Sequence, residues 1–218
     1  MTTNHRANVP QRIIGLTGGI AMGKTAVSSY LASRHHLPVL DADLYARAAV
    51  EPGTAVLAAI ADRYGSGVLL ANGQLNRQRL GEIVFNSAAE RLWLEQCIHP
   101  YVRDRLVKES TTPPLNDANH CPILVMVIPL LFEARMTDLV TETWVVVCAN
   151  ECQIKRLMAR DSISREQAIA RINSQMTITK KMARADVVLE NSTSLEDLFL
   201  QVDEFLLRQP DHVTSWQH

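Results

Sequence analysis

The sequence lacks the features that mark membrane, secreted or zinc proteins. No run approaches the roughly 18 consecutive apolar residues of a membrane helix, and the first residues hold no apolar segment of the kind found in signal peptides. The cysteines form no CxxC pair and have no histidines at zinc-site spacing: Cys97, Cys121, Cys148 and Cys152. We therefore expect reduced thiols, a cytoplasmic location and no membrane partner.

The sequence also lacks an excess of charge of one sign. It has 22 lysines and arginines against 23 acidic residues, a formal net charge of −1. A nucleic-acid-binding protein usually carries a basic field, so we expect no nucleic acid partner, and any anion site must be local. We expect a monomer, although the sequence leaves an oligomer open.

Five short apolar runs follow one another along the chain. They comprise residues 13–17, 37–40, 123–128, 144–148 and 187–189. Each is apolar on both alternations, as strands covered on both faces of a parallel sheet are. Helical patterns separate the runs, so the sequence predicts a three-layer α/β/α fold around a five-stranded parallel sheet.

The helical patterns have recognisable start signals. Ser87, Ser164 and Ser194 are each followed three residues later by Glu90, Gln167 and Asp197, which resembles a capping box. The last signal opens an amphipathic helix over residues 195–206.

These patterns predict a single domain over residues 12–208. Its core comprises residues 12–43, 121–149 and 185–208, and it has two helical insertions, an acceptor insertion at 44–110 and a lid segment at 150–184. The turn-rich stretch 110–120 predicts a surface loop, and residues 1–11 and 209–218 are expected to be flexible tails.

One motif between the first strand and the next helix carries a mechanism. Residues 18–25 read GGIAMGKT, which fits G-x-x-x-x-G-K-[ST] and is called here the phosphate loop. Consecutive backbone N–H groups at a helix N-terminus bind a polyphosphate, and glycine permits the close approach. Lys24 would supply charge to the β- and γ-phosphates and the Thr25 hydroxyl would ligate Mg²⁺, so we expect the P-loop nucleoside triphosphatase fold.

Two acids follow the second strand. Asp41 and Asp43 lie where the carboxyl ends of parallel strands form a ligand site. Alternate residues of an extended segment point the same way, so both acids could face the γ-phosphate, one holding the metal and one acting as base. The alternative is that they cap the next helix.

A guanine-nucleotide switch is the less favoured interpretation. The guanine-selecting N/T-K-x-D motif is absent. Residues 62–65 read DRYG and match DxxG, but they follow the helix-favouring residues 56–61 rather than a strand, so we interpret the match as accidental.

A local anion site is suggested by the basic segment 155–184. The basic residues of this segment outnumber its acids, which are Asp161 and Glu166. The basic residues are Lys155, Arg156, Arg160, Arg165, Arg171, Lys180, Lys181 and Arg184. A closing lid that brings arginines onto a transferred phosphoryl group stabilises its charge and excludes water. We choose Arg160 for that role, whereas a solvated helical face explains most of the others.

The motifs together resemble the dephospho-CoA kinase family over nearly the whole folded chain. The resemblance rests on Gly15–Ile20 with Gly23–Thr25, Asp41–Asp43 with Ala46-Arg47, Glu51–Gly53, Ile98–Pro100, Pro129–Glu133, Gln153 with 156–161, Arg171 with Gln175, and Ala185-Asp186 with Asn191. It implies phosphorylation of the ribose 3′-hydroxyl of dephospho-CoA by ATP and Mg²⁺.

The resemblance also implies roles for individual residues. ATP would be bound by Gly18, Gly19, Ile20, Ala21, Met22, Gly23, Lys24, Thr25, Ala26 and Asn191, the last near the adenine. The catalytic residues would be Asp43, Lys24 and Arg160, the acceptor-binding residues Asp43, Arg47, His99 and Glu133, and the metal ligands Thr25 and Asp41. A packed helical role for His99 and a strand-end anchor for Glu133 remain alternatives.

The phosphate loop departs from the family pattern. Ala21 and Met22 stand where relatives usually have Gly-Ser, and a side chain at Ala21 requires a negative φ to be tolerated without strain. Val127 stands where some relatives have an acid, so we assign no metal ligand there. Within enzymes, the main alternative function is a nucleoside or nucleotide kinase.

Overall fold

The computed structural model describes residues 11–85, 87–113, 115 and 122–208. The strands are β1 (Arg12–Gly18), β2 (Val39–Asp41), β3 (Ile123–Val127), β4 (Glu142–Val147) and β5 (Val187–Glu190). All pairings are parallel and the order is β2-β3-β1-β4-β5, with Leu16 opposite Val127 on one side and Trp144 on the other. The predicted five-stranded parallel sheet is confirmed.

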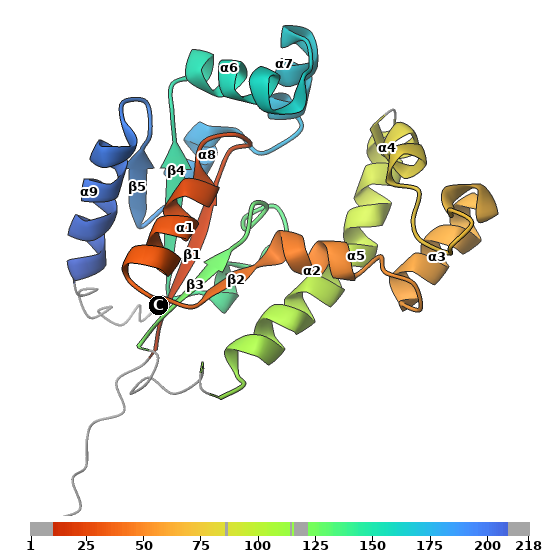
Figure 1. The fold of residues 1–218 in the computed structure, drawn as a ribbon, viewed down its shortest axis with the longest axis horizontal. Coiled ribbons are helices and arrows are strands. Elements are labelled where there is room, and N and C mark those ends of the chain that lie inside the picture. The colour runs from red at the N-terminus through yellow and green to blue at the C-terminus, as the bar shows by residue number, and fades with distance from the viewer. Residues whose placement is uncertain (1–10, 86, 114, 116–121, 209–218) are drawn as a thin grey trace, which may run out of the picture.

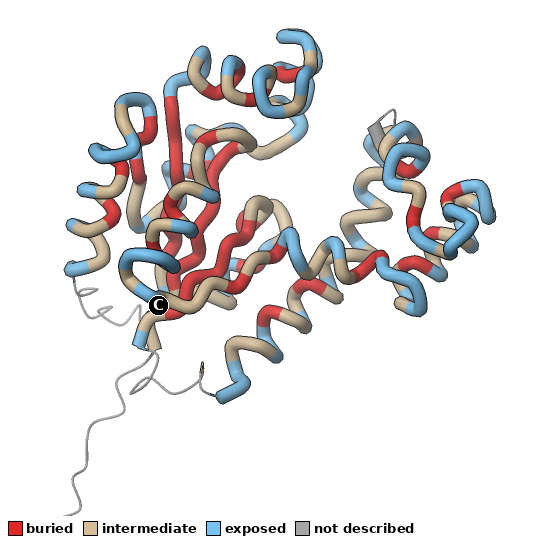
Figure 2. The backbone as a smooth tube through the Cα atoms, viewed as in Figure 1, coloured by how far each residue is buried: buried red, intermediate tan, exposed pale blue. Residues whose placement is uncertain are grey.

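Helices cover both faces of the sheet. α1 (Lys24–Arg34) and α9 (Leu195–Leu207) pack on one face, where Trp144, Leu31 and Leu198 are fully buried. α5 (Ala88–Ser110) and the segment after β3 pack on the other face, around Leu106 and Met126. The three-layer α/β/α fold is therefore confirmed, and Figure 2 shows the buried backbone concentrated in the strands.

The acceptor insertion is helical and has a small core of its own. Besides α5 it contains α2 (Ala42–Ala48), α3 (Ala55–Tyr64), the 3₁₀ turn η1 (Ser66–Val68) and α4 (Arg77–Phe85). Leu57, Ile60, Val68 and Leu80 are buried together in it. Because Asp62 lies within α3, the DxxG match is not at a strand end.

The lid segment contains α6 (Asn150–Asp161), α7 (Arg165–Asn173) and α8 (Ile178–Met182), while a 3₁₀ turn, η2 (Thr137–Leu139), precedes β4. The strands run towards the top of Figure 1, so α6 and α7 lie above their carboxyl ends while α3 and α4 lie to the right. Ser164 forms the full reciprocal capping box with Gln167, whereas Ser87 and Ser194 each cap their helix through the side chain.

Some expectations fall on residues that are not described. The tails at 1–10 and 209–218, and residues 114 and 116–120 of the expected surface loop, lie outside the described residues. The domain boundaries and the functional roles of the two insertions stay predictions.

Candidate active site

The phosphate loop is shaped by backbone that only glycine adopts without clashes. Gly18 has φ 149°, and a Cβ atom there would lie 2.4 Å from the carbonyl oxygen of Val146. Gly23, which precedes α1, has φ 107°, and its Cβ would lie 2.1 Å from Nδ2 of Asn191. The loop therefore lies tightly against the carboxyl ends of β4 and β5.

Side chains from three other segments hold the loop. The Asn191 amide, 2% exposed, donates to the carbonyl of Met22 at 2.8 Å. Gln153 on α6 donates to the carbonyl of Ile20 at 2.9 Å, and the Ile20 N–H donates to Oε1 of Gln175 at 3.1 Å. The loop is thus fixed to both the sheet and the lid segment before any ligand binds.

Ala21 does not have the negative φ that we expected for a side chain at this position. Its φ is 58°, in the left-handed region, which costs about 1–2 kcal/mol for a residue with a Cβ. However, Ile20 and Ala21 pack against an apolar cluster of α6 and α7 that includes Ile154, Leu157 and Ala168. These contacts with the lid segment help offset the strain.

Lys24 lies within this loop and is strongly desolvated. Its Nζ donates to the carbonyls of Gly19 at 2.9 Å and Gly18 at 3.2 Å. Burial, and then the charge of Lys181, lower the pKa of Lys24 to about 8, although Asp43 opposes the shift. A bound polyanion would favour the charged form.

The two acids after β2 are placed differently from our expectation. The extended segment ends at Asp41, and Asp43 is already in the first turn of α2, so the alternation argument is wrong. The capping alternative holds for Asp41, because its Oδ1 accepts the N–H of Asp43 at 2.9 Å. Burial and the charge of Asp41 raise the pKa of Asp43, while Lys24 and Arg47 oppose this shift.

A cleft of about 390 Å³ lies between the loop and the lid segment. Its walls include Ala21, Lys24, Thr25, Pro129, Arg156 and Arg160. Nη1 of Arg156 is buried and has no hydrogen-bond partner among the described residues. This phosphate cleft therefore holds donors on two sides, the loop and α6.

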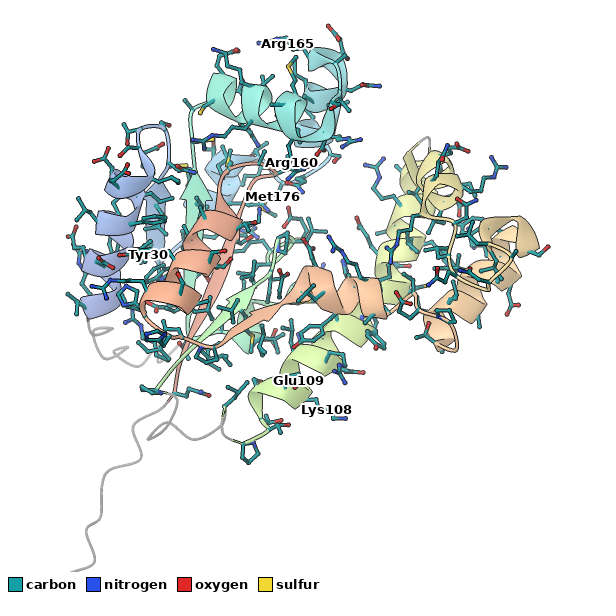
Figure 3. The ribbon with its side chains drawn as sticks, viewed as in Figure 1. Tyr30, Lys108, Glu109, Arg160, Arg165 and Met176 are labelled. Atoms are coloured by element: carbon teal, nitrogen blue, oxygen red, sulfur yellow. The ribbon has the colours of Figure 1, made fainter. Side chains whose placement is uncertain are left out.

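Arg160 lies in the last turn of α6, at the underside of the lid helices and above the phosphate loop in Figure 3, whereas Arg165 is on the outer side. Asp161 accepts from Nε of Arg160 at 2.8 Å and from Nη1 of Arg171 at 2.5 Å. The carboxylate orients two arginines. Because Nε and Nη2 of Arg160 both donate to Asp161, Arg160 can reach a ligand only with the rest of its guanidinium or after rotating.

Behind the cleft lies an ion pair whose cation is buried. Lys181 on α8 is fully buried, and its Nζ lies 3.0 Å from Oε1 of Glu133 and 3.0 Å from the carbonyl of Pro129, to which it donates. Oε1 of Glu133 also accepts the N–H of Met176 at 3.0 Å. Glu133 thus anchors the base of the lid segment to the segment that follows β3. This agrees with the alternative in which Glu133 serves as an anchor.

Two further pockets, distinct from the phosphate cleft, are bordered by Asp43. The inner pocket, about 260 Å³, lies between α2, α5 and the segment after β3, and includes Asp43, His99, Ile128 and Pro129. The outer pocket, about 340 Å³, lies between α2, α4 and α5, and includes Asp43, Arg47 and Leu80. Asp43 borders both pockets, and Pro129 is common to the inner pocket and the phosphate cleft.

The structure therefore brings most of the expected site residues together. Lys24 lies close enough to Asp43, Arg160 and Glu133 for their charges to affect its pKa. Burial lowers the pKa of His99, which faces the inner pocket. A further cavity of about 370 Å³, bordered by Gly19, Met22 and Asn150, lies between the loop and the lid segment. Asn191 contacts the loop but, in the described part of the chain, is not among the residues that line this cavity, the phosphate cleft or the two pockets.

Sequence reasoning missed two basic residues of this region. Arg156 belongs to the motif that carries the family resemblance but has no predicted role of its own, although it lies one turn before Arg160 on the same helical face, a spacing that could have identified it. Lys181 gave no such signal, because its burial depends on how α8 docks on β4.

Comparisons with known proteins agree on one family. The family model described as dephospho-CoA kinase matches residues 12–197. A relative named dephospho-CoA kinase, from Trichormus variabilis, is 60% identical over 196 residues, 88% of this chain and 95% of the relative.

Two solved structures extend the comparison to the fold. TT1252 from Thermus thermophilus is 34% identical with a TM-score of 0.73, covering 92% of this chain and all of that one. The dephospho-CoA kinase from Campylobacter jejuni is 27% identical with a TM-score of 0.65, covering 89% and 94%.

We predict that Lys181→Met destabilises the protein, because it leaves the carboxylate of Glu133 without its charged partner. Since Glu133 is partly exposed, the expected loss in the free energy of unfolding is about 1–3 kcal/mol. Urea denaturation measures it. The matched control Lys180→Met, on the exposed side of α8, should change stability by less than about 0.5 kcal/mol; equal losses in the two variants would contradict the role of the pair.

Proposed function

The chain belongs to the dephospho-CoA kinase family, and from this membership we propose that it transfers the γ-phosphoryl group of ATP to the ribose 3′-hydroxyl of dephospho-CoA. The products are ADP and coenzyme A, so the reaction is the last step of coenzyme A synthesis. The observation that best supports this reaction is the position of Asp43, which borders both pockets and interacts electrostatically with Lys24 of the phosphate loop.

The triphosphate of ATP binds in the phosphate cleft. Backbone N–H groups of the phosphate loop surround the phosphates at the start of α1, where the helix dipole favours negative charge. The N–H groups of Ile20, Met22 and Ala26 already donate within the protein, so the others are the ones available to phosphate oxygens. Lys24 moves from the Gly18 and Gly19 carbonyls to the β- and γ-phosphates. The nucleoside fits the cavity beside Met22 and Asn150, with Asn191 holding the loop behind it.

The acceptor hydroxyl binds at Asp43. Its carboxylate accepts the hydrogen of the 3′-hydroxyl and takes the proton as the oxygen attacks phosphorus. A raised pKa makes Asp43 a better base than an ordinary exposed aspartate, while the charge of Lys24 opposes that rise and favours the carboxylate. Arg47 and His99 contact the remainder of the acceptor from the two pockets.

Charge on the transferred phosphoryl group is stabilised from the lid segment. Arg156 has a buried donor without a partner among the described residues, and Arg160 lines the same cleft. Donors that face the place where charge develops lower the barrier most when water is excluded. Closure of α6 over the cleft would supply both conditions.

A magnesium ion fits the oxygen ligands at this site. The Thr25 hydroxyl is exposed at the start of α1, and Asp41 has one carboxylate oxygen occupied by the N–H of Asp43 and the other available. These two residues would hold the ion together with phosphate oxygens and water, the arrangement that Mg²⁺ favours. When bound, the ion neutralises phosphate charge.

Three further expectations stay predictions. They are the cytoplasmic location, the monomeric state and the absence of a nucleic acid partner. Within the described ranges, no helix combines the length and apolar character that crossing a bilayer demands.

The proposed reaction predicts a specific acceptor dependence. The purified protein with Mg²⁺ and ATP should release ADP much faster when dephospho-CoA is added, and mass spectrometry should detect coenzyme A. If dephospho-CoA gives no stimulation while a nucleoside, a nucleotide or shikimate does, the acceptor is wrong.

Asp43→Asn should lower kcat by about 10²- to 10⁴-fold, since the asparagine amide cannot take the proton. Affinity for ATP should be unchanged or slightly higher, because a negative charge near the γ-phosphate is lost. Steady-state kinetics and calorimetry separate the two effects. Asp62→Asn, an exposed acid on α3, is the control and should leave kcat unchanged; a normal kcat in Asp43→Asn would remove its role as base.

The lowered pKa of Lys24 predicts a pH-dependent affinity for ATP. In the free protein Lys24 loses its proton as the pH rises through about 8, while bound ATP holds the proton on. The dissociation constant should therefore rise about tenfold per pH unit above pH 8, up to the higher pKa of the complex. Titration calorimetry from about pH 7.5 to 9.5 measures it. Lys24→Met should bind weakly with no such dependence, and a flat profile in the unaltered protein would contradict the shift.

A further inference from the structure

The two pockets that meet at Asp43 differ in charge. In the inner pocket the acids Asp43 and Glu95 accompany a single arginine, Arg91. In the outer pocket Arg47 and Arg77 accompany Asp43 alone. Acids outnumber arginines in the inner pocket, and arginines outnumber acids in the outer one.

The arginines of these pockets also differ from most others in the molecule. Ion pairs occupy Arg12, Arg63, Arg79, Arg103, Arg105, Arg160, Arg165, Arg171 and Arg208. No residue in the described part of the chain forms an ion pair with Arg47, Arg77 or Arg91. A guanidinium group that lines a pocket and forms no ion pair within the described part of the chain is available to phosphate oxygens.

The inner pocket has the character of a site for a flat heterocycle. Its walls are largely apolar, with Leu94, Ile98 and Val102 of α5 facing Ile128 and Met136. Arg91, Glu95 and His99 succeed one another at i, i+4 spacing and present polar atoms along one side of the same helix. An apolar slot with a few polar groups at its edge is typical of small-molecule recognition.

The proposed acceptor, dephospho-CoA, has a heterocyclic base and a diphosphate that match the different characters of the two pockets. Its reacting ribose must lie at Asp43, which borders both pockets, so the adenine and the 5′-diphosphate extend in different directions. A diphosphate in the inner pocket would face Glu95 and Asp43, and like charges repel. In the outer pocket the diphosphate would meet Arg47 and Arg77.

On the basis of the proposed function, we propose that dephospho-CoA binds with its adenine in the inner pocket, read by Glu95 and His99, and its diphosphate in the outer pocket on Arg47 and Arg77. The Glu95 carboxylate accepts from the exocyclic amino group of adenine, which hypoxanthine and guanine lack at that position. The pantetheine arm then follows the apolar wall of Leu75, Leu80 and Val84. Arg77 and Glu95 are therefore specificity-determining residues for the acceptor.

Two kinetic measurements on the full-length protein test this orientation. The first is the salt dependence of KM for dephospho-CoA, which reports the contact with the diphosphate. The second is the ratio of kcat/KM for dephospho-CoA to that for its inosine counterpart, which reports recognition of the base. Each variant is measured both ways.

Arg77→Ala should raise KM for dephospho-CoA roughly tenfold or more and weaken its salt dependence, with the base ratio unchanged. Glu95→Gln should lower the base ratio at least about tenfold with the salt dependence unchanged, because an amide can donate to the oxygen of hypoxanthine. Arg79→Ala is the matched control on α4, since Arg79 lines neither pocket and pairs with Glu82, and it should change neither quantity.

Other outcomes overturn the orientation. If Arg77→Ala changes only the base ratio, or Arg91→Ala rather than Arg77→Ala weakens the salt dependence, the two pockets are exchanged. If Arg77→Ala and Glu95→Gln both behave like Arg79→Ala, neither pocket binds the acceptor as stated. Failure of the unaltered protein to phosphorylate dephospho-CoA would instead refute the proposed function itself.

Discussion

The active site depends on one constraint, which is that the phosphate loop must keep the backbone N–H groups at the start of α1, those of Gly23, Lys24 and Thr25, available while its carbonyls are paired elsewhere. Asn191 takes the carbonyl of Met22, Gln153 takes that of Ile20, and Lys24 takes those of Gly18 and Gly19. Only the last of these pairings has to break for a phosphate to bind. The sheet and the lid segment therefore preorganise the loop, which lowers the entropy lost on binding.

The same arrangement gathers cations in a confined space. Lys181 is fully buried and Lys24 is half-buried, and Arg156 and Arg160 line the same cleft as Lys24. Glu133 forms an ion pair with Lys181. The pKa of Lys24 is nevertheless lowered, first by burial and then by the positive charges of Lys181 and Arg160. A bound polyphosphate would remove the repulsion, so nucleotide binding would stabilise the charged form of Lys24 together with the arginines of α6.

The sequence predicted those parts of the site that depend on local patterns. The strands and the phosphate loop follow from apolar runs, glycines and one lysine within a few residues, and the helix of Leu195–Leu207 follows from its periodicity. Asp43 was expected on an extended segment, because nothing local showed that α2 begins at Ala42. Lys181 resembles the exposed Lys180 in sequence, and only the docking of α8 distinguishes them.

The anchors of the lid segment also limit which parts of it can move. Lys181 and the N–H of Met176 hold the base of α8 to Glu133 and Pro129, and Gln153 holds the first turn of α6 to the loop. Arg156 lies one turn beyond Gln153 and is therefore held close to the phosphates. Arg160 lies a further turn along the helix, next to α7 and its partner Asp161. Gln153 therefore fixes Arg156 near the phosphate loop, whereas Asp161 holds the guanidinium of Arg160 beside α7, so the two arginines of one helical face are positioned by different contacts.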